Sequence, residues 1–346
     1  MTAGNTRQRR FRMLMVGLAV ALVATVLTSA MLGAASLSPG EVVRATVSLF
    51  APDRVDAASY PSWAPRLLRD LRLPRIVMAL VAGLALSTAG ATLQGVFRNP
   101  LAEPYLLGVS AGAAVGATIA IIWKPLAFLG IFGLPVLAFG GALLAAFLVY
   151  RLATFAEETS SVSLLLSGVA VGSTFTAVLS LLMVATQYDL RTVVVWLMGG
   201  LTTASWTKIA VAAPLVMAGF VIMLAHAPRL NLMLMGETRA KELGVDAHAT
   251  RRNLLVVASL TTAGAVAFTG LIGFVGLMVP HMVRLILGPD HRHVLPAAGL
   301  LGALFLLLAD TLARTILDPA EIPVGIITAF VGGPFFLYLL RTRRGV

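Results

Sequence analysis

Long apolar stretches without ionisable side chains are the feature that most limits how this chain can fold. Several exceed about 18 residues, the length at which a helix crosses a hydrocarbon core of roughly 30 Å. Backbone amides in lipid must bond within the chain, so these stretches have to be helical. Of the 346 residues, 58% are hydrophobic and only 12% are charged, a mixture too apolar for a water-soluble domain. We therefore expect an all-α membrane protein.

Ten candidate spans follow from these stretches, and together they make a single transmembrane domain. They cover about 11–33, 74–97, 106–123, 127–150, 162–186, 207–226, 251–269, 272–287, 295–317 and 324–340. A polar stretch at 34–73 separates the first two spans, and a second at 227–250 lies on the opposite side of the membrane. Residues 1–33 could instead be a cleaved signal peptide, although the apolar run Met13–Gly33 is long for one.

The positive charges indicate how the chain is oriented. With a cytoplasmic N-terminus, inner segments hold 16 of the 26 Lys and Arg residues, and outer segments hold 10. This excess fits the positive-inside rule and places both termini in the cytoplasm. Trp63, Trp123, Trp196 and Trp206 fall near predicted outer ends, an interfacial position that Trp favours. The charges form short runs between spans rather than one basic face, so nucleic acid is not an expected partner.

A short repeat suggests internal symmetry. The segment "LSTAGA" at 86–91 recurs as "LTTAGA" at 260–265. Five spans separate the copies, so they cross the bilayer in opposite directions, as in the inverted-topology repeats of transporters. A six-residue match of small residues can also arise by chance, and both readings stay open.

The sequence holds little that could support catalysis. No GxxxxGK[ST] phosphate loop is present. Asp310 is the best candidate for an ion-coupling carboxylate, but Arg314 follows it by four residues and the two are expected to pair. His281, His291 and His293 lie near a predicted inner helix end, where anchoring is a better reading than metal binding. The chain has no Cys, so neither disulfides nor thiolate metal sites are available. With these motifs missing, we expect no catalytic residue, no cofactor and no bound metal.

Seven segments, in order, carry a resemblance to a known family. They are "LRLPR" (71–75), "RNPLAEPYLLGVSAGA" (98–113), "DLRTVVVWLMGG" (189–200), "LNLMLMGETRAKELGV" (230–245), "GFVGLMVPHMVRLILGPDHRHVLP" (273–296), "LLLADTLAR" (306–314) and "AEIPVGIITAFVGGPFFLYLL" (320–340). With them the chain resembles the FecCD/BtuC-like permeases of ABC importers for iron–siderophore complexes, haem and cobalamin. The resemblance implies a homodimer in the plasma (inner) membrane of a prokaryote, working with two ATPase subunits and an extracytoplasmic solute-binding protein. Its cargo would be an iron chelate, with iron–siderophore favoured over haem and cobalamin.

The resemblance also implies roles for particular residues. The amphipathic segment "GETRAKELG" would be a coupling helix, with Leu243 and Ala240 on one side, that docks on the ATPase through Gly236, Glu237, Ala240, Leu243 and Gly244. The binding protein would dock on Arg72, Arg75 and Arg314. The cytoplasmic gate would be Thr159, Ser160 and Ser161, and the outer gate would be Trp196, Met198, Gly199 and Gly200. The fifth and tenth spans would line the path.

Two other classes of function compete with an ATP-driven importer. An ion-coupled secondary transporter is the main alternative, and uptake that followed a proton gradient while ignoring ATP would support it. A membrane-embedded enzyme has no constellation of residues behind it, since neither HExxH nor a paired-carboxylate spacing is present.

Overall fold

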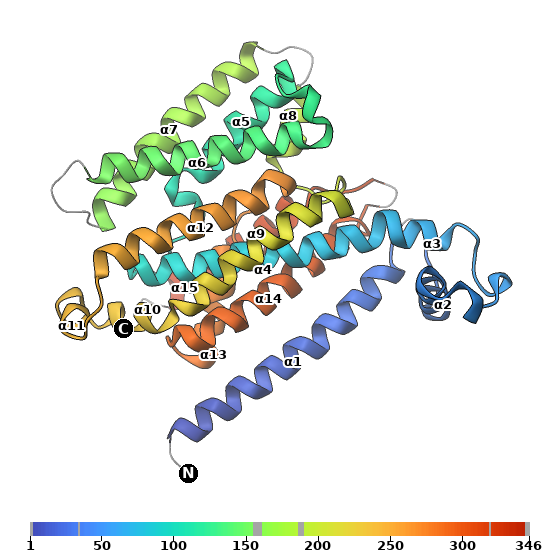
Figure 1. Ribbon diagram of the computed structural model, residues 1–346, viewed down its shortest axis with the longest axis horizontal. Helices are drawn as coiled ribbons and strands as arrows, with labels where there is room; N and C mark the ends of the chain where they lie inside the picture. The colour runs from blue at the N-terminus through green and yellow to red at the C-terminus, as the bar shows by residue number, and fades with distance from the viewer. Residues whose placement is uncertain (1–2, 34, 155–160, 186–189, 318–319, 343–346) are drawn as a thin grey trace.

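The computed structural model describes residues 3–33, 35–154, 161–185, 190–317 and 320–342, and these fold into a bundle of helices (Figure 1). Seven of the described helices are long and apolar enough to cross a membrane, and three shorter apolar helices accompany them. The protein is therefore an all-helical, multi-span membrane protein with about ten apolar helices. These helices are α1 (Ala3–Met31), α4 (Leu73–Phe97), α5 (Val109–Trp123), α6 (Gly133–Thr154), α7 (Ser161–Ala185), α9 (Trp206–Ala225), α12 (Ala247–Thr269), α13 (Val275–Leu287), α14 (His291–Ala313) and α15 (Val324–Thr342).

Short elements cover the two ends of the bundle. The end that carries α11 is called the α11 end below, and the end that carries α2 is called the α2 end (Figure 1). The short helices are α2 (Pro39–Phe50), α3 (Ala64–Arg66), α8 (Leu190–Leu197), α10 (Ala227–Leu234) and α11 (Glu237–Glu242). Four 3₁₀ turns lie at Pro52–Arg54, Ala57–Ser59, Pro104–Leu107 and Ala127–Phe132, and a π turn at Leu67–Arg72 leads into α4.

Local capping chemistry explains where the helices depart from the predicted spans. Helix α14 starts at His291 rather than near 295, because the Asp290 side chain accepts a hydrogen bond from Arg292 N–H and caps the helix. Helix α5 starts at Val109 rather than 106, because a 3₁₀ turn ends at Gly108 with a positive φ of 72°. Glycine takes that backbone conformation without strain.

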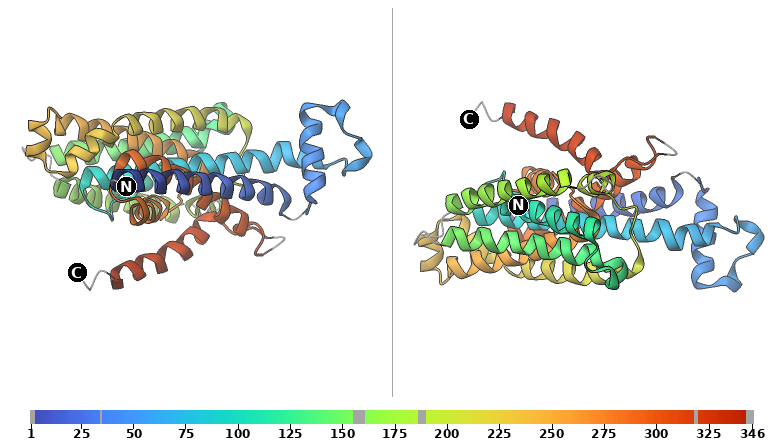
Figure 2. Two further views of the ribbon diagram at one scale, coloured as in Figure 1. Left: turned by 90° about the horizontal axis from the view of Figure 1, so that it is seen from below. Right: turned by 90° about the horizontal axis from the view of Figure 1, so that it is seen from above.

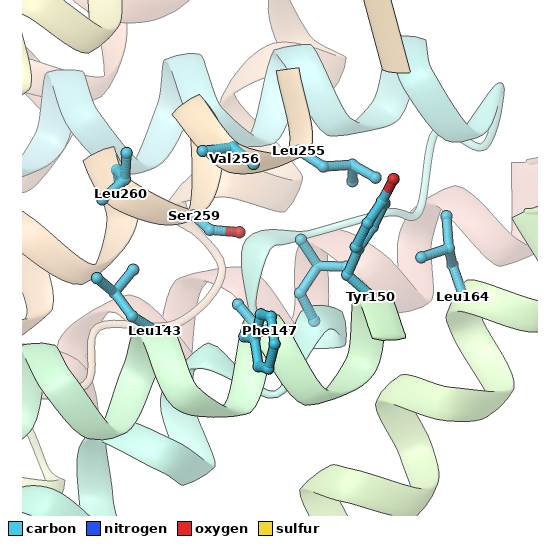
Figure 3. Close-up of a pocket in the computed structure, with 10 residues that line it drawn as sticks. Leu143, Phe147, Tyr150, Leu164, Leu255, Val256, Ser259 and Leu260 are labelled. Atoms are coloured by element: carbon cyan, nitrogen blue, oxygen red, sulfur yellow. The ribbon is translucent and has the colours of Figure 1, made fainter. Parts of the chain in front are cut away.

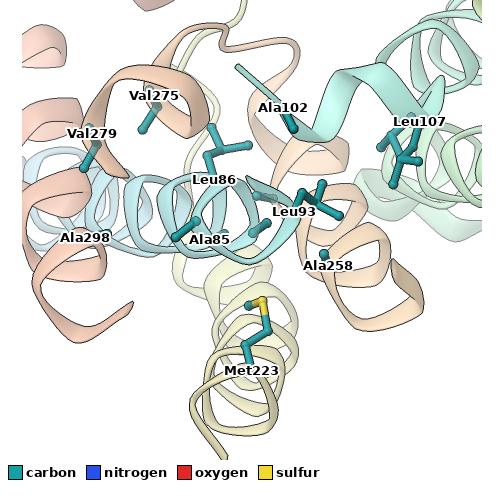
Figure 4. Packing of buried hydrophobic residues seen from close by; sticks show 14 of the residues in the cluster. Ala85, Leu86, Leu93, Ala102, Leu107, Met223, Ala258, Val275, Val279 and Ala298 are labelled. Carbon is teal, nitrogen blue, oxygen red and sulfur yellow. The ribbon is translucent and has the colours of Figure 1, made fainter. Parts of the chain in front are cut away.

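Helix α4 lies at the centre of the bundle. It packs against α14, α12, α9 and α13, and 78% of the most apolar window in its span is buried. Figure 4 shows Leu86 and Leu93 of α4 among side chains from these neighbours, including Val279 of α13 and Met223 of α9. All of these side chains are 2% exposed or less.

Glycines let backbones touch around α4. A Cβ added at Gly90 would lie 2.0 Å from the carbonyl oxygen of Gly276 in α13, and one at Gly83 would lie 2.2 Å from that of Gly302 in α14. Real Cβ atoms do not approach so closely, so these contacts require glycine. Small residues at helix contacts are the usual means of close packing in membranes.

The two copies of the short repeat lie in neighbouring helices. Residues 86–91 belong to α4 and 260–265 to α12, and the two helices pack against each other and run in opposite directions (Figure 1). This arrangement is what an inverted repeat would give, and the repeat itself stays a prediction.

Helices α7 and α15 lie at the edges of the bundle. Only 11% of the most apolar window of α7 is buried. Helix α15 leans away from the bundle, on the opposite side from α12 (Figure 2). Its described outward side chains include Phe330 and Leu337, which are 75% and 67% exposed. Both helices therefore present broad faces to lipid or to another chain.

Candidate functional site

The predicted coupling segment is a compact pair of short helices. Helix α10 turns Leu230 and Met233 into the bundle, where both are almost fully buried. The chain then reverses at Gly236, whose φ is +112°, and the turn after α11 contains Gly244, whose φ is +78°. Val245 N–H closes the turn by donating to the carbonyl of Ala240 at 2.9 Å. Both glycines occupy backbone conformations that residues with a Cβ rarely adopt.

The outward face of the α11 segment differs from the one expected. Ala240 and Leu243 were predicted to share one side, but Ala240 is 0% exposed and Leu243 is 59% exposed. Ala240 therefore packs inward and holds α11 on the bundle. The exposed apolar surface is made by Leu243 together with Met235, which is 55% exposed. Arg239 and Lys241 are also exposed, whereas the side chain of Glu237 lies outside the described part of the structure.

A hydrogen-bonded clamp joins α10 to the α13–α14 turn. The Asn231 amide donates to Asp290 Oδ1 at 2.6 Å, and His291 N–H donates to Asn231 Oδ1 at 2.8 Å. Burial alone would raise the pKa of Asp290. The hydrogen bonds from Arg292 N–H and Asn231, with the charges of His293 and Arg7, lower that pKa below its usual value. These hydrogen bonds join α10 to the start of α14.

Asn231 was not singled out from the sequence. The available signal was its amide in the otherwise apolar run "LNLMLM". Asn231 is partly buried, and polar groups withdrawn from water need hydrogen-bond partners, so its amide joins α10 to the α13–α14 turn.

The three histidines near the predicted inner helix end, His281, His291 and His293, contact different neighbours. The His291 ring lies beneath α10, where Nδ1 is 3.0 Å from Asn231 Oδ1. The His293 ring packs on Phe11 of α1 with ring centroids 4.6 Å apart, and the His281 ring meets Phe335 of α15 edge to face. Among the described residues, no three His, Cys, Asp or Glu side chains are grouped so that they could hold a metal ion.

Two further contacts fix α13 at this end. Arg284 donates to the Gln94 side chain and to the Ala91 carbonyl of α4, and Gln94 donates to the Gly276 and Leu277 carbonyls at 3.2 Å. Arg7 of α1 donates to the Leu287 carbonyl at 2.9 Å. The α11 end therefore behaves as one connected platform.

At the α2 end, the three arginines predicted to dock a binding protein lie around a hollow of about 380 Å³. Arg72 is 4% exposed and donates to the carbonyls of Ala30, Met31 and Ala35. Arg314 is 6% exposed and donates to Ser29. These contacts hold α1 against α4 and α14, so Arg72 and Arg314 have structural partners that the sequence did not reveal.

Arg75 pairs with two carboxylates beside the same hollow. Its Nε lies 2.9 Å from Asp310 Oδ2, and its Nη1 lies 2.8 Å from Glu321 Oε2. The expected pair of Asp310 with Arg314 is present as a longer ion pair, with 3.9 Å between Arg314 Nε and Asp310 Oδ2. The closer partner of Asp310 is therefore Arg75 of α4, a contact between distant parts of the chain. Other arginines of this end, Arg66 and Arg69, are exposed.

The predicted outer gate is held by glycine contacts. Gly199 has a φ of +70°, and a Cβ there would lie 2.3 Å from the Leu271 carbonyl oxygen. A Cβ on Gly325 of α15 would lie 2.1 Å from the Met198 carbonyl oxygen, and Gly200 N–H donates to the Thr269 carbonyl at 2.7 Å. Trp196 is partly buried and Met198 is 40% exposed. The segment thus touches both α12 and α15, and its gating role stays a prediction.

The predicted inner gate precedes α7. Thr159 and Ser160 lie outside the described residues, and Ser161 is the first residue of α7, with its side chain outside the description. Along the described part of α7, Ser173, Thr176 and Ser180 lie on one exposed face. Thr176 and Ser180 donate to carbonyls four residues back, at 2.8 and 2.9 Å. This satisfies the hydroxyl protons within the helix and leaves a smooth, weakly polar face.

Fold and site together define a class of protein. The chain is a bundle of apolar helices with a platform at one end and an arginine-lined hollow at the other, which is typical of the membrane component of a transporter. It matches the FecCD transport family over residues 4–342, and it belongs to that family. It is a permease subunit of an ABC transporter, a transport component rather than an enzyme, and part of a larger complex.

Relatives and solved structures agree with this assignment. The chain is 50% identical over 284 residues to the cobalamin import system permease of Halobacterium salinarum, covering 82% of this chain and 76% of the relative. It is 38% identical to the Fe(3+)-citrate import system permease YfmE of Bacillus subtilis, covering 97% and 96%. A solved metal-chelate-type ABC transporter in an inward-facing conformation superposes with a TM-score of 0.83 at 32% identity, covering 96% and 99%.

Proposed function

We propose that this permease imports a bulky metal chelate, received from an extracytoplasmic binding protein and driven by two cytoplasmic ATPase subunits. The observation that carries the proposal is the α11 segment, where Leu243 is exposed on a short helix whose other side is anchored through Ala240. An exposed apolar side chain on a rigid mount suits a partner that pushes on it. By the positive-inside rule, this end is cytoplasmic.

The cargo is proposed from the relatives and from the path. One relative is named for cobalamin and another for ferric citrate, so the shared chemistry is a large chelated metal. The family resemblance favours an iron–siderophore, with haem and cobalamin as the other candidate cargoes. The α7 face offers hydroxyls already bonded within the helix, and such a surface would let a large chelate pass without binding it tightly.

A homodimer completes the path in this proposal. Helices α7 and α15 would meet their twofold mates, and the gate residues at 159–161 and at 196–200 would close the two ends. The breadth of the exposed faces on both helices supports this arrangement, since 11% burial leaves most of α7 without a partner in the single chain.

The α2 end is proposed to receive the binding protein. Arg72, Arg75 and Arg314 line a hollow that an acidic side chain could enter, while Arg66 and Arg69 are exposed on the outer loop. Arginine forks match carboxylates, and rim charges mainly speed encounter. Reversing both exposed charges, with Arg66→Glu and Arg69→Glu, should slow association with the binding protein and weaken its dependence on salt.

The test of ATP coupling uses the exposed leucine. In vesicles that contain the permease, its ATPase and its binding protein, Leu243→Asp should abolish ATP-driven uptake of ferric siderophore or cobalamin. Leu243→Met keeps an apolar side chain and should retain uptake. Uptake by Leu243→Asp at the wild-type rate would contradict the proposal, and uptake driven by a proton gradient without ATP would favour a secondary transporter.

A further inference from the structure

A groove between α6 and α12 has no part in the proposed transport cycle. It holds about 220 Å³ and is lined mostly by apolar side chains. Figure 3 shows Leu143, Phe147 and Tyr150 of α6 facing Leu255, Val256 and Ser259 of α12. The floor is buried, since Leu164 and Leu255 are 1% and 5% exposed. The rim is open, since Phe147 and Val256 are 57% and 52% exposed.

The surroundings decide what fills this groove. Apolar voids of this size stay dry and take up apolar molecules, and walls that face an empty space lose their van der Waals contacts. The groove opens sideways along two spans, so the molecules beside it are lipid acyl chains. Helices α12 and α15 lie on opposite sides of the bundle (Figure 2), which places the groove away from the α15 face assigned above to a second copy. Helix α7, also assigned to a second copy, contributes to the groove only through Leu164, which is buried inside the single chain.

Two arginines lie one helical turn from the groove, toward the α11 end. Arg151 follows Phe147 by four residues on α6, and Arg252 precedes Val256 by four residues on α12. Residues four apart share a helix face, so each arginine continues one wall of the groove. Both arginines are exposed. Guanidinium groups pair with phosphate oxygens through two parallel hydrogen bonds.

We propose that this groove binds an anionic phospholipid, with one acyl chain between α6 and α12 and the phosphate held between Arg151 and Arg252. The apolar walls and the paired charges select different parts of the same molecule. A neutral lipid can use the walls, but it gains less from the two arginines. The site is independent of the cargo and of ATP, so its test does not depend on whether the proposed function is correct.

A fluorescent reporter tests the headgroup preference. The four natural tryptophans, Trp63, Trp123, Trp196 and Trp206, are remote in sequence from the groove residues of α6 and α12. The variant Phe147→Trp adds an indole at the rim. In vesicles of phosphatidylcholine, a small fraction of brominated phosphatidylglycerol should quench the added indole at a several-fold lower mole fraction than brominated phosphatidylcholine does.

Charge variants in the reporter background locate the headgroup site. Each arginine near an anionic lipid is expected to contribute about fivefold in affinity, so Arg151→Gln with Arg252→Gln should remove most of the preference. Arg229→Gln makes the same charge change on α10 and should leave the preference intact. Equal quenching by the two lipids in the reporter protein would overturn the proposal, as would a preference that survives loss of both arginines.

A groove-filling variant separates a built site from general surface charge. Ala146 lines the groove, and Ala146→Phe in a reporter protein should remove the preference while both arginines remain. If the preference persisted in this variant, the arginines would attract anionic lipid without the groove, and the proposed site would be wrong.

Discussion

Helices α4 and α7 have nearly the same hydropathy and opposite surroundings. Their most apolar windows have mean hydropathies of 2.0 and 1.9, yet 78% of the first and 11% of the second is buried. The hydropathy of a helix therefore indicates that it lies in the membrane. It does not indicate whether the helix lies inside the bundle or at its lipid-facing edge. What separates the two helices is how many backbone contacts and charged pairs each makes with its neighbours.

The largest effect is expected where α4 meets α14 through a buried charge. Asp310 has no exposed side chain and lies 2.9 Å from Arg75. Asp310→Asn removes the charge and leaves a buried guanidinium with a poorer partner, which typically costs about 3–5 kcal/mol. The midpoint of thermal unfolding in detergent should fall strongly.

Glu321 provides the matched control for this pair. It also bonds Arg75, but its side chain is 41% exposed, and exposed ion pairs contribute about 1 kcal/mol or less. Glu321→Gln should therefore shift unfolding only slightly. Equal shifts for the two variants would show that burial does not set the strength of this contact.

A single methyl group tests the backbone contacts of α4 directly. Gly90→Ala would place a Cβ 2.0 Å from the Gly276 carbonyl oxygen, and overpacking of this kind costs about 1–3 kcal/mol or more. On α7, a Cβ at Gly172 meets nothing within 4 Å, so Gly172→Ala should leave stability unchanged. We expect a loss of monodisperse protein for the first variant alone. A tolerated Gly90→Ala would mean that α4 and α13 can separate more easily than their packing indicates.

Helix α4 also contacts the hydrogen-bonded clamp at the α11 end. A Cβ at Gly95 of α4 would lie 2.5 Å from His291 Nε2, and His291 in turn bonds Asn231. Asn231→Ala removes two hydrogen bonds in a partly buried place, and a net loss of about 1–2 kcal/mol is expected. Asn253 is exposed on α12, and Asn253→Ala should have no measurable effect. The two variants are compared by thermal unfolding and by ATP-driven uptake.

The acid dependence of this clamp has a definite sign. The folded-state pKa of Asp290 is lowered by its hydrogen bonds, relative to about 3.9 in an unfolded chain. Its stabilising contribution is therefore present above about pH 4 and is lost as the pH falls through the folded-state pKa. The difference in stability between the wild type and Asn231→Ala should shrink in that acid range. If the difference in stability stayed constant across that pH range, the contribution of Asn231 would not depend on the charge of Asp290.

The sequence predicted elements better than contacts. About ten apolar helices follow from length and hydropathy, because lipid forces the backbone to bond within each span. The expected pair of Asp310 with Arg314 is present at 3.9 Å, but the closer partner, Arg75, was missed because only helix packing brings it near. The face of α11 was wrong, because six helical residues make fewer than two turns, and the neighbouring α10 decides which side is covered.

The smallest structural effect is expected on α7, where a change at the exposed face alters little within one chain. The protein has no Cys, so Ser173→Cys introduces a unique thiol on that face, and the cost in stability should stay within about 0.5 kcal/mol. In the proposed homodimer, the thiols of two copies would approach across the path and should be joined by a short bifunctional maleimide. Leu144→Cys on α6 is also exposed, at 52%, but no second copy is proposed there, so it should stay uncrosslinked. Crosslinking of both positions to the same extent would indicate random collision, and crosslinking of Leu144→Cys alone would place the second copy on the wrong face of the bundle.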